Sequence, residues 1–340
     1  MMRNLFVLLV VASLGWSSYW WLGSNAKDQA INAWMADRRA DGWVADTSDI
    51  IVRGYPNRFD TTFRDLNIAD PDSGWAWAAP WFQIFALSYK PNHIIAVWPP
   101  EQSLASPVER ITVTSSDMRG SLRFAPSTAL DLSEARIQLE EFALASSLKW
   151  SARLESGQLA IRRSPEDARW DNAYDISLRA DQLTLPGPLR DVLDPAGLLP
   201  KTMETADIRL TPVYDAPWNR LTIEDRLPTL QILNIGNVSF TWGRMSMTVT
   251  GRLDADPNGQ AEGQLNVIAR NWRDMLELSV QSGWVSADLQ GTLETTLALL
   301  ARGTGQTDRL DVTLNFKNGS TRLGPIPIGE APYLNQGQNL

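Results

Sequence analysis

Beyond Thr47, apolar and polar residues alternate with a period of two over much of the chain. Clear runs cover residues 148–154, 174–179, 245–253 and 310–317. Such alternation places an apolar row on one face of a strand and a polar row on the other, as in an antiparallel sheet with one wet face. A parallel α/β sheet would show continuous apolar strands separated by helices. The pattern therefore predicts a mainly β fold with a few helices, built on a long antiparallel meander sheet.

Turn residues support a series of hairpins. Asn318-Gly319 separates two strand-like runs, and residues 256–259 (DPNG) and Ser156-Gly157 stand at similar places. A long one-sided sheet must cover its apolar face. We expect the sheet either to fold into a packed sandwich or to curl into a groove, and the sequence does not decide between these two forms.

The first 22 residues contain an uncharged apolar run, residues 5–22, preceded by Arg3 and ending in aromatic residues. Eighteen helical residues cover roughly 27 Å, close to the hydrocarbon thickness of a bilayer. We interpret the run as an uncleaved membrane anchor with the N-terminus inside and the bulk of the chain outside. A cleaved signal peptide, with Ser24-Asn25-Ala26 at the cleavage site, and a buried core helix are the alternatives.

A second helix is expected over residues 26–39, capped by Ser24 and stopped at Gly42. Ile31, Trp34 and Met35 form its apolar stripe, which either lies on the membrane surface or, as we favour, covers one end of the sheet. The expected domains are an anchor (1–24), an amphipathic helix (25–45), a first β half (46–185), a connector (186–203), a second β half (204–328) and a polar tail (329–340).

A late helical hairpin is expected at about residues 271–302, inside the second β half. Asn271 and Asp274 have the spacing of a capping box, and Gly283 would end the first helix. A short helix is expected at residues 189–193, within the connector.

Composition narrows the possible functions. The 340 residues include no cysteine and one histidine, His93, so thiol chemistry, thiolate metal sites and disulfides are excluded. There are 31 basic and 39 acidic residues, a formal charge of −8, which argues against a nucleic-acid partner.

No motif predicts catalysis. Residues 146–149 (SSLK) match an S-x-x-K pattern, but the alternation around them predicts a strand where that chemistry needs a helix start. Residues 254–259 resemble the start of a calcium loop, yet Leu265 stands where a bidentate Glu is required. We therefore expect no enzyme activity, no catalytic residue, no metal and no cofactor.

Aromatic and apolar residues supply the candidate ligand contacts. Trp75, Trp77 and Trp81 share one strand face if the chain stays extended through Pro80. On that face they either contact lipid or a partner protein, or they pack in the core. The other candidates come from the second β half: Trp242, Met245, Met247 and Leu265.

Several segments resemble known families. Gly54-Tyr55-Pro56, Arg58-Phe59 and residues 63–68 (FRDLNI) are similar to the opening of AsmA-like envelope proteins. Ala79-Pro80, Trp242-Gly243 and residues 323–329 (LGPIPIG) resemble an alphaproteobacterial family called domain of unknown function 2125 (DUF2125). That resemblance implies a single N-terminal anchor in the inner membrane and a β-rich periplasmic body, without known catalytic residues. The looser analogy to AsmA-like proteins implies a curled sheet that holds acyl chains.

These observations together predict a membrane-anchored, periplasmic, non-enzymatic protein that binds lipid in an apolar β groove. The alternative is a structural or assembly scaffold with a packed β sandwich and no ligand. The expected partners are the inner membrane, lipid and other envelope proteins.

Overall fold

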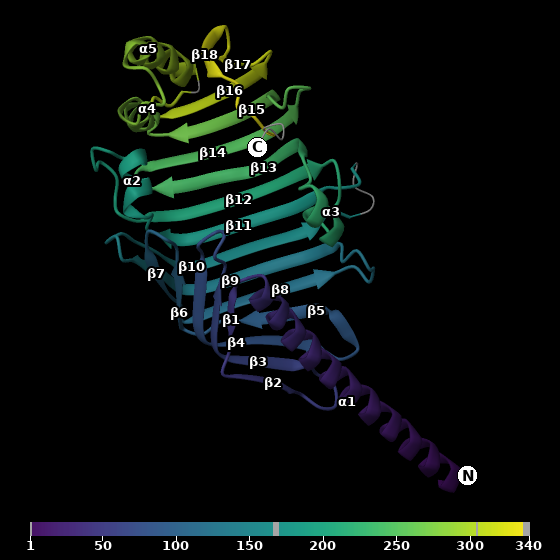
Figure 1. Cartoon of the computed structure of the whole chain (residues 1–340). Helices are drawn as coiled ribbons and strands as arrows, with labels where there is room; N and C mark the ends of the chain where they lie inside the picture. Colours follow the sequence, from purple (N-terminus) through teal and green to yellow (C-terminus); the bar gives the residue numbers. More distant parts are fainter. Residues whose placement is uncertain (1, 166–169, 304, 336–340) are drawn as a thin grey trace. The chain divides into compact units, whose positions relative to one another are not determined.

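The structure is a computed structural model that describes residues 2–165, 170–303 and 305–335 (Figure 1). The strand pairs are antiparallel, so the fold is mainly β, as the alternation predicts. The chain divides into two compact units. Unit 1 comprises Met1–Phe124 and Ile137–Lys149, and unit 2 comprises Ala125–Arg136 and Trp150–Leu340. The last five residues of the expected polar tail, 336–340, lie outside the described residues.

One uninterrupted helix, α1 (Met2–Ala40), opens unit 1 and is drawn in purple in Figure 1. Our prediction that Ser24 caps a separate helix is wrong, because nothing between the apolar run and the amphipathic segment breaks the helix and Ser24 lies in its interior. The helix ends as expected at Gly42, whose φ of 87° lets the Trp43 N–H reach the Arg38 carbonyl at 2.9 Å.

The strands of unit 1 pair partly out of sequence order. β3 pairs with β1, β2 and β4, and β4 also pairs with β5 and β6. β8 then pairs with β5, and both β6 and β9 pair with β7. The strands are β1 (Val44–Asp46), β2 (Asp49–Arg53), β3 (Asp60–Ala69), β4 (Ala76–Leu87), β5 (Lys90–Val97), β6 (Glu101–Ala105), β7 (Arg110–Thr114), β8 (Asp117–Phe124) and β9 (Leu132–Ser146), whose first five residues belong to unit 2.

The core of unit 1 lies between α1 and the sheet. Met35, 2% exposed, packs with Phe63 and Leu66 of β3, and Ile31 lies beside them. Trp34 is 47% exposed, so the apolar stripe of α1 is narrower than its sequence suggests. The second half of α1 thus covers part of the sheet, the reading that we favoured.

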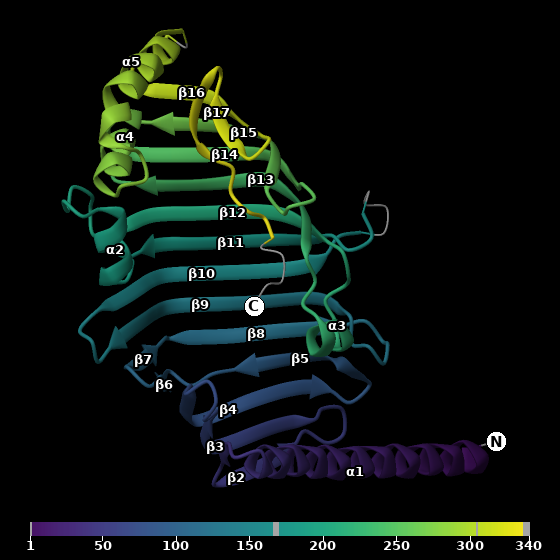
Figure 2. The same ribbon diagram turned by 45° about the horizontal axis from the view of Figure 1, so that its top comes forward.

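Unit 2 contains a meander in which each strand from β10 to β18 pairs with the next, and Figure 2 shows β10 to β14 as consecutive arrows. The strands are β10 (Ser151–Arg163), β11 (Tyr174–Leu183), β12 (Met203–Tyr214), β13 (Leu230–Trp242), β14 (Met245–Ala255), β15 (Ala261–Arg270), β16 (Arg309–Lys317), β17 (Ser320–Leu323) and β18 (Ile326–Glu330). The expected connector falls inside this unit, because the strands on either side of it, β11 and β12, pair directly.

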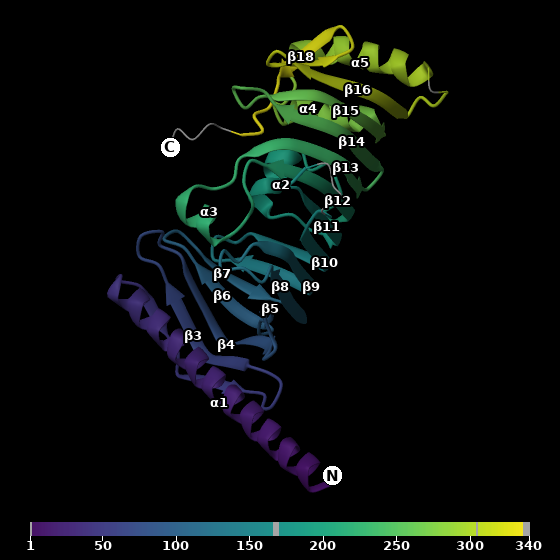
Figure 3. The ribbon, with the colours of Figure 1, turned by 90° about the vertical axis from the view of Figure 1, so that its right-hand side faces the viewer.

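Short helices occupy the connections of unit 2. α2 (Gly187–Leu193) confirms the short connector helix, and α3 (Arg220–Asp225), capped by Asn219, follows β12. The late hairpin is confirmed as α4 (Trp272–Gln281) and α5 (Ala287–Gly303), which lie beside β14–β16 (Figures 2 and 3). The capping box expected there is wrong: Asn271 is left-handed (φ 53°), and its amide donates to the Arg244 carbonyl instead of capping the helix.

Candidate functional site

The sheet of unit 2 carries apolar rows that cross several strands in register. Because side chains on one face repeat at every second residue, residues paired across neighbouring strands share a face. The first row consists of Leu159, Leu178, Ile208, Val238, Val249, Val267 and Val312. The second row consists of Ile161, Ile176, Leu210, Ile235, Gly251, Leu265, Leu314 and Leu323. With strands about 4.8 Å apart, the first row extends roughly 29 Å across the sheet.

At β14–β17 these rows are covered by the helical hairpin. Trp272 and Leu276 of α4 and Leu293 of α5 form a buried core with Leu310 and Val312 of β16. Each of these side chains is less than 10% exposed. The hairpin therefore lies on the apolar face, the placement that a groove partly filled by the two helices requires.

At β10–β13 the same rows have no comparable cover. Their side chains are half-buried, and in the part of the chain that the structure describes they belong to none of the three core clusters. We call this set the open rows: Leu159, Ile161, Ile176, Leu178, Ile208, Leu210, Ile235 and Val238. A contiguous apolar surface of this kind is the usual mark of a binding site.

An apolar cleft of about 560 Å³ opens where the rows meet the hairpin. That volume is within the range of roughly 300–1,000 Å³ that ligand sites occupy. Met247, Val267 and Val312 line its floor, while Trp284, 68% exposed, stands at its mouth. The polar lining residues are few: Ser279, Thr321 and Glu330.

Part of the floor of this cleft consists of residues that were predicted from the sequence. Met247 lines the cleft, and Leu265 lies on the second row, opposite Gly251. Met245 and Trp242 are only 3% and 5% exposed, and the Trp242 indole donates to the Pro200 carbonyl at 2.8 Å. These two residues are thus placed in the interior rather than on the open surface.

The three tryptophans of the first β half do not share a face, which corrects our expectation. Trp77 packs in the core of unit 1 against Phe82, with ring centroids 5.3 Å apart, and donates to Gln102 at 2.7 Å. In a regular strand, residues five positions apart point to opposite sides, yet Trp77 and Phe82 point to the same side. The alternation of β4 therefore reverses between them. The reversal lies at Pro80, which faces Asp65 of β3, a residue with a left-handed backbone (φ 49°). Trp81, next to Phe82, points to the other side.

Trp75 lies just before β4 and is 51% exposed. The tryptophan set is therefore divided between the core and the surface of unit 1.

The helix residues that complete the cleft, above all Trp272, Met275 and Trp284, were not predicted from the sequence. The apolar spacing of the two late helices was visible, but the strand face on which they pack was not. Alternation assigns residues to faces without saying which face a distant helix will cover.

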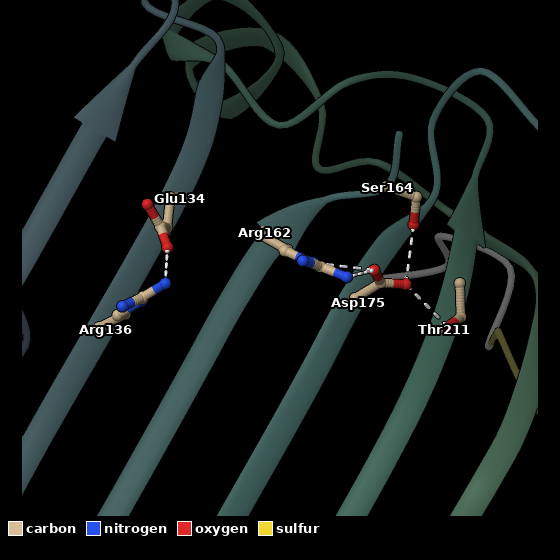
Figure 4. Close-up of polar contacts among 6 residues, drawn as sticks. All are labelled: Glu134, Arg136, Arg162, Ser164, Asp175 and Thr211. Atoms are coloured by element: carbon tan, nitrogen blue, oxygen red, sulfur yellow. Dashed lines mark hydrogen bonds and ion pairs between the residues drawn. The ribbon is translucent and has the colours of Figure 1, made fainter. Parts of the chain in front are cut away.

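The opposite face of unit 2 is polar, and some of its charges form the ion pairs drawn in Figure 4. Asp175 accepts hydrogen bonds from Arg162 and Ser164 at 3.0 Å and from Thr211 at 3.1 Å. Arg136 pairs with Glu134 on β9. These groups line a polar cleft of about 520 Å³, but the Asp175 carboxylate is held by three donors on its own sheet and is not poised to attack a substrate.

The other residues that the sequence offered as candidates for catalysis make hydrogen bonds within the sheet or at the end of a strand. His93 shares a hydrogen bond with Ser121 across β5 and β8 at 3.0 Å. Ser146 ends β9 and bonds Glu109, but residues 147–149 of the S-x-x-K segment form a turn in place of the predicted strand. No helix starts there either, since the next element is β10, which begins at Ser151. Over the described ranges, no group of three His, Asp or Glu residues is arranged to hold a metal ion.

The comparisons with known proteins identify a family and no activity. Searches of curated proteins and of solved structures give no match. The proposed similarity to AsmA-like proteins stays a prediction. A family model described as "Uncharacterized protein conserved in bacteria (DUF2125)" matches residues 20–332. Since that match covers most of the sequence, the chain belongs to the DUF2125 family, the resemblance that its closing residues indicated.

Proposed function

We propose that this protein is a membrane-anchored, non-enzymatic protein of the bacterial envelope that binds lipid acyl chains on the apolar face of unit 2. The observation that carries the proposal is the continuity of the apolar rows from the open strands β10–β13 into the cleft under α4 and α5.

The dimensions of the rows suit an acyl chain. One leaflet of a bilayer is about half of its roughly 30 Å hydrocarbon core. The four open strands β10–β13 span a similar length, about 14 Å at about 4.8 Å per strand, so they can accept a lipid tail that continues into the cleft. Each methylene group removed from water contributes about 0.8 kcal/mol. Charged side chains such as Arg162, Asp175 and Arg209 lie on the other face, and the open rows offered to the tail consist of uncharged aliphatic side chains.

Membrane attachment is supported by α1, which is long and apolar enough to cross a bilayer. We place the rest of the chain in the periplasm, with single-pass anchoring in the inner membrane. A short basic start before a long downstream region favours export of that region.

Native mass spectrometry of the full chain, purified in a mild detergent, tests lipid binding. We expect co-purifying phospholipid, identified by extraction. Met247→Glu places a charge on the cleft floor and should remove the lipid. Thr248→Glu is the matched control, because the adjacent residue pairs with Ser239 on the polar face. Both variants are checked by thermal unfolding. Lipid-free wild-type protein, or equal lipid loss in the two variants, would contradict the proposal.

A scaffold role in the envelope is the second candidate. It is favoured by the outer surface of α5, where Leu289, Leu299 and Leu300 are 40%, 63% and 43% exposed. Affinity capture from envelope extracts, comparing wild type with Leu299→Gln, separates the two functions. A scaffold loses its protein partners in this variant, whereas a lipid-binding protein keeps its lipid.

A further inference from the structure

We propose that unit 1 is itself partly immersed in the membrane, with residues 54–59 and the turn at Ser88–Tyr89 inserted beside α1, from the lipid headgroups into the outer part of the hydrocarbon region. This inference rests on the proposed role of α1 as a membrane anchor. It adds a second, non-helical membrane contact whose partner is the phospholipid bilayer surface.

The end of the apolar run is hydrogen-bonded to these two segments. The indole N–H of Trp16 donates to the Pro56 carbonyl at 2.9 Å, and that of Trp20 donates to the Arg58 carbonyl at 2.7 Å. The Tyr19 hydroxyl donates to the Ser88 carbonyl at 2.7 Å. Three aromatic residues of the expected span are thus bound to backbone atoms of unit 1.

Ring packing makes this junction close. Trp20 stacks on Phe59 with centroids 6.0 Å apart and meets the edge of Tyr55 at 5.5 Å. Gly23 leaves room for the Phe59 ring: a Cβ atom there would lie 2.7 Å from the ring's Cζ atom. The helix and the loop therefore hold one position relative to each other, and the depth of one determines the depth of the other.

The depth follows from helix geometry. Residues 2–15, which precede the junction, extend only about 21 Å at ~1.5 Å per residue, less than the roughly 30 Å hydrocarbon core. The helix must therefore remain in the membrane beyond Trp16, to about Leu22. Trp16 then lies about 9 Å below Leu22 along the axis, and the Pro56 carbonyl that it binds is carried to the same level.

The residues of the two segments suit this position. Tyr55 and Tyr89 are 59% and 56% exposed, and tyrosine is a residue that favours the interface between water and lipid. The exposed basic residues Arg53 and Lys90 flank the segments in sequence, as expected for contact with lipid phosphates. The segments are also joined to each other, since the Ser88 N–H donates to the Asn57 carbonyl at 2.9 Å.

Site-specific labelling tests the proposal, because the absence of cysteine makes any introduced thiol unique. The full chain is reconstituted into phosphatidylethanolamine–phosphatidylglycerol vesicles. An environment-sensitive fluorophore is attached at Asn57→Cys or, as an independent site, at Tyr89→Cys. Val108→Cys, 77% exposed in the β6–β7 turn of unit 1, reports an aqueous position, and Leu8→Cys reports the anchor.

We expect labels at 57 and 89 to show blue-shifted emission, quenching by lipids labelled near the headgroup, and severalfold weaker quenching by aqueous iodide than the label at 108. If labels at 57 and 89 are as accessible as that at 108 while Leu8→Cys is in lipid, the inference is overturned and the anchor stands. If the label at Leu8→Cys is also in water, the anchor itself is refuted.

Discussion

The apolar face of unit 2 has two regions built from the same residue types but covered differently. At β14–β17, α4 and α5 pack on the sheet, and Leu310 and Val312 are 6% and 9% exposed. At β10–β13 the corresponding positions, such as Leu210 and Ile208, are half-buried. The alternation of apolar and polar residues alone therefore does not distinguish a core from a binding surface. Coverage by another element makes the difference.

The largest expected effect comes from the covered region. Leu310→Ala should lower the free energy of unfolding by about 2–5 kcal/mol, since a cavity is left between β16 and the hairpin. Chemical denaturation followed by circular dichroism measures the loss. A loss below that of the open-region variants would show that the hairpin does not pack as described.

Tyr174 marks one end of the open region, where the segment before α3 covers β11. Its buried hydroxyl accepts the Trp218 N–H at 2.9 Å. Tyr174→Phe should cost about 1–3 kcal/mol, because that donor loses its partner. An unchanged unfolding midpoint would mean that the Trp218 N–H is satisfied by water.

The same tyrosine predicts a dependence on alkaline pH. Burial raises the pKa of Tyr174 above its ordinary value of about 10. The folded state therefore prefers the protonated phenol, and its contribution to stability, complete below that ordinary pKa, is lost as pH rises through the raised value. Wild type should lose more stability than Tyr174→Phe between neutral and strongly alkaline pH. Parallel pH profiles of the two proteins would contradict this.

Leu210→Ala, the same substitution in the open region, should cost only about 1 kcal/mol in lipid-free protein, because the side chain is already half in contact with water. The pair Leu310→Ala and Leu210→Ala thus measures the difference in coverage directly. Equal costs would indicate that another part of the chain covers the open rows.

The smallest effect is expected on the polar face. Arg209 pairs with Asp207 at 3.1 Å, and its side chain is 67% exposed. Arg209→Gln should change the free energy of unfolding by no more than about 0.5 kcal/mol, as is typical of surface ion pairs. Thermal scans at low and high salt provide the check, and a large, salt-dependent loss would assign the polar face a structural role.

Much of this architecture was predictable, for reasons visible in particular residues. The alternation around Met247 and Leu265 identified the strands and their apolar face, and Asn318-Gly319 located a hairpin. The stop at Gly42 followed from the need for a positive φ after the helix.

Other features depend on contacts that local patterns do not contain. The reversal of side-chain direction near Asp65 and Pro80 separates Trp77 from Trp81, although a simple strand would keep them together. The junction of Trp16 with Pro56 joins residues 40 positions apart. Such long-range contacts decide which aromatic residues are buried in the core and which lie at the surface.

Photocrosslinking at adjacent residues of β12 tests the central claim most directly. The photoreactive amino acid p-benzoylphenylalanine replaces either Leu210, on the open rows, or Arg209, on the polar face. The cells are illuminated, and the protein is then purified and analysed by mass spectrometry. The account predicts phospholipid adducts at position 210 and none at position 209. Protein adducts alone at 210, or equal lipid adducts at both positions, would contradict acyl-chain binding on the open rows.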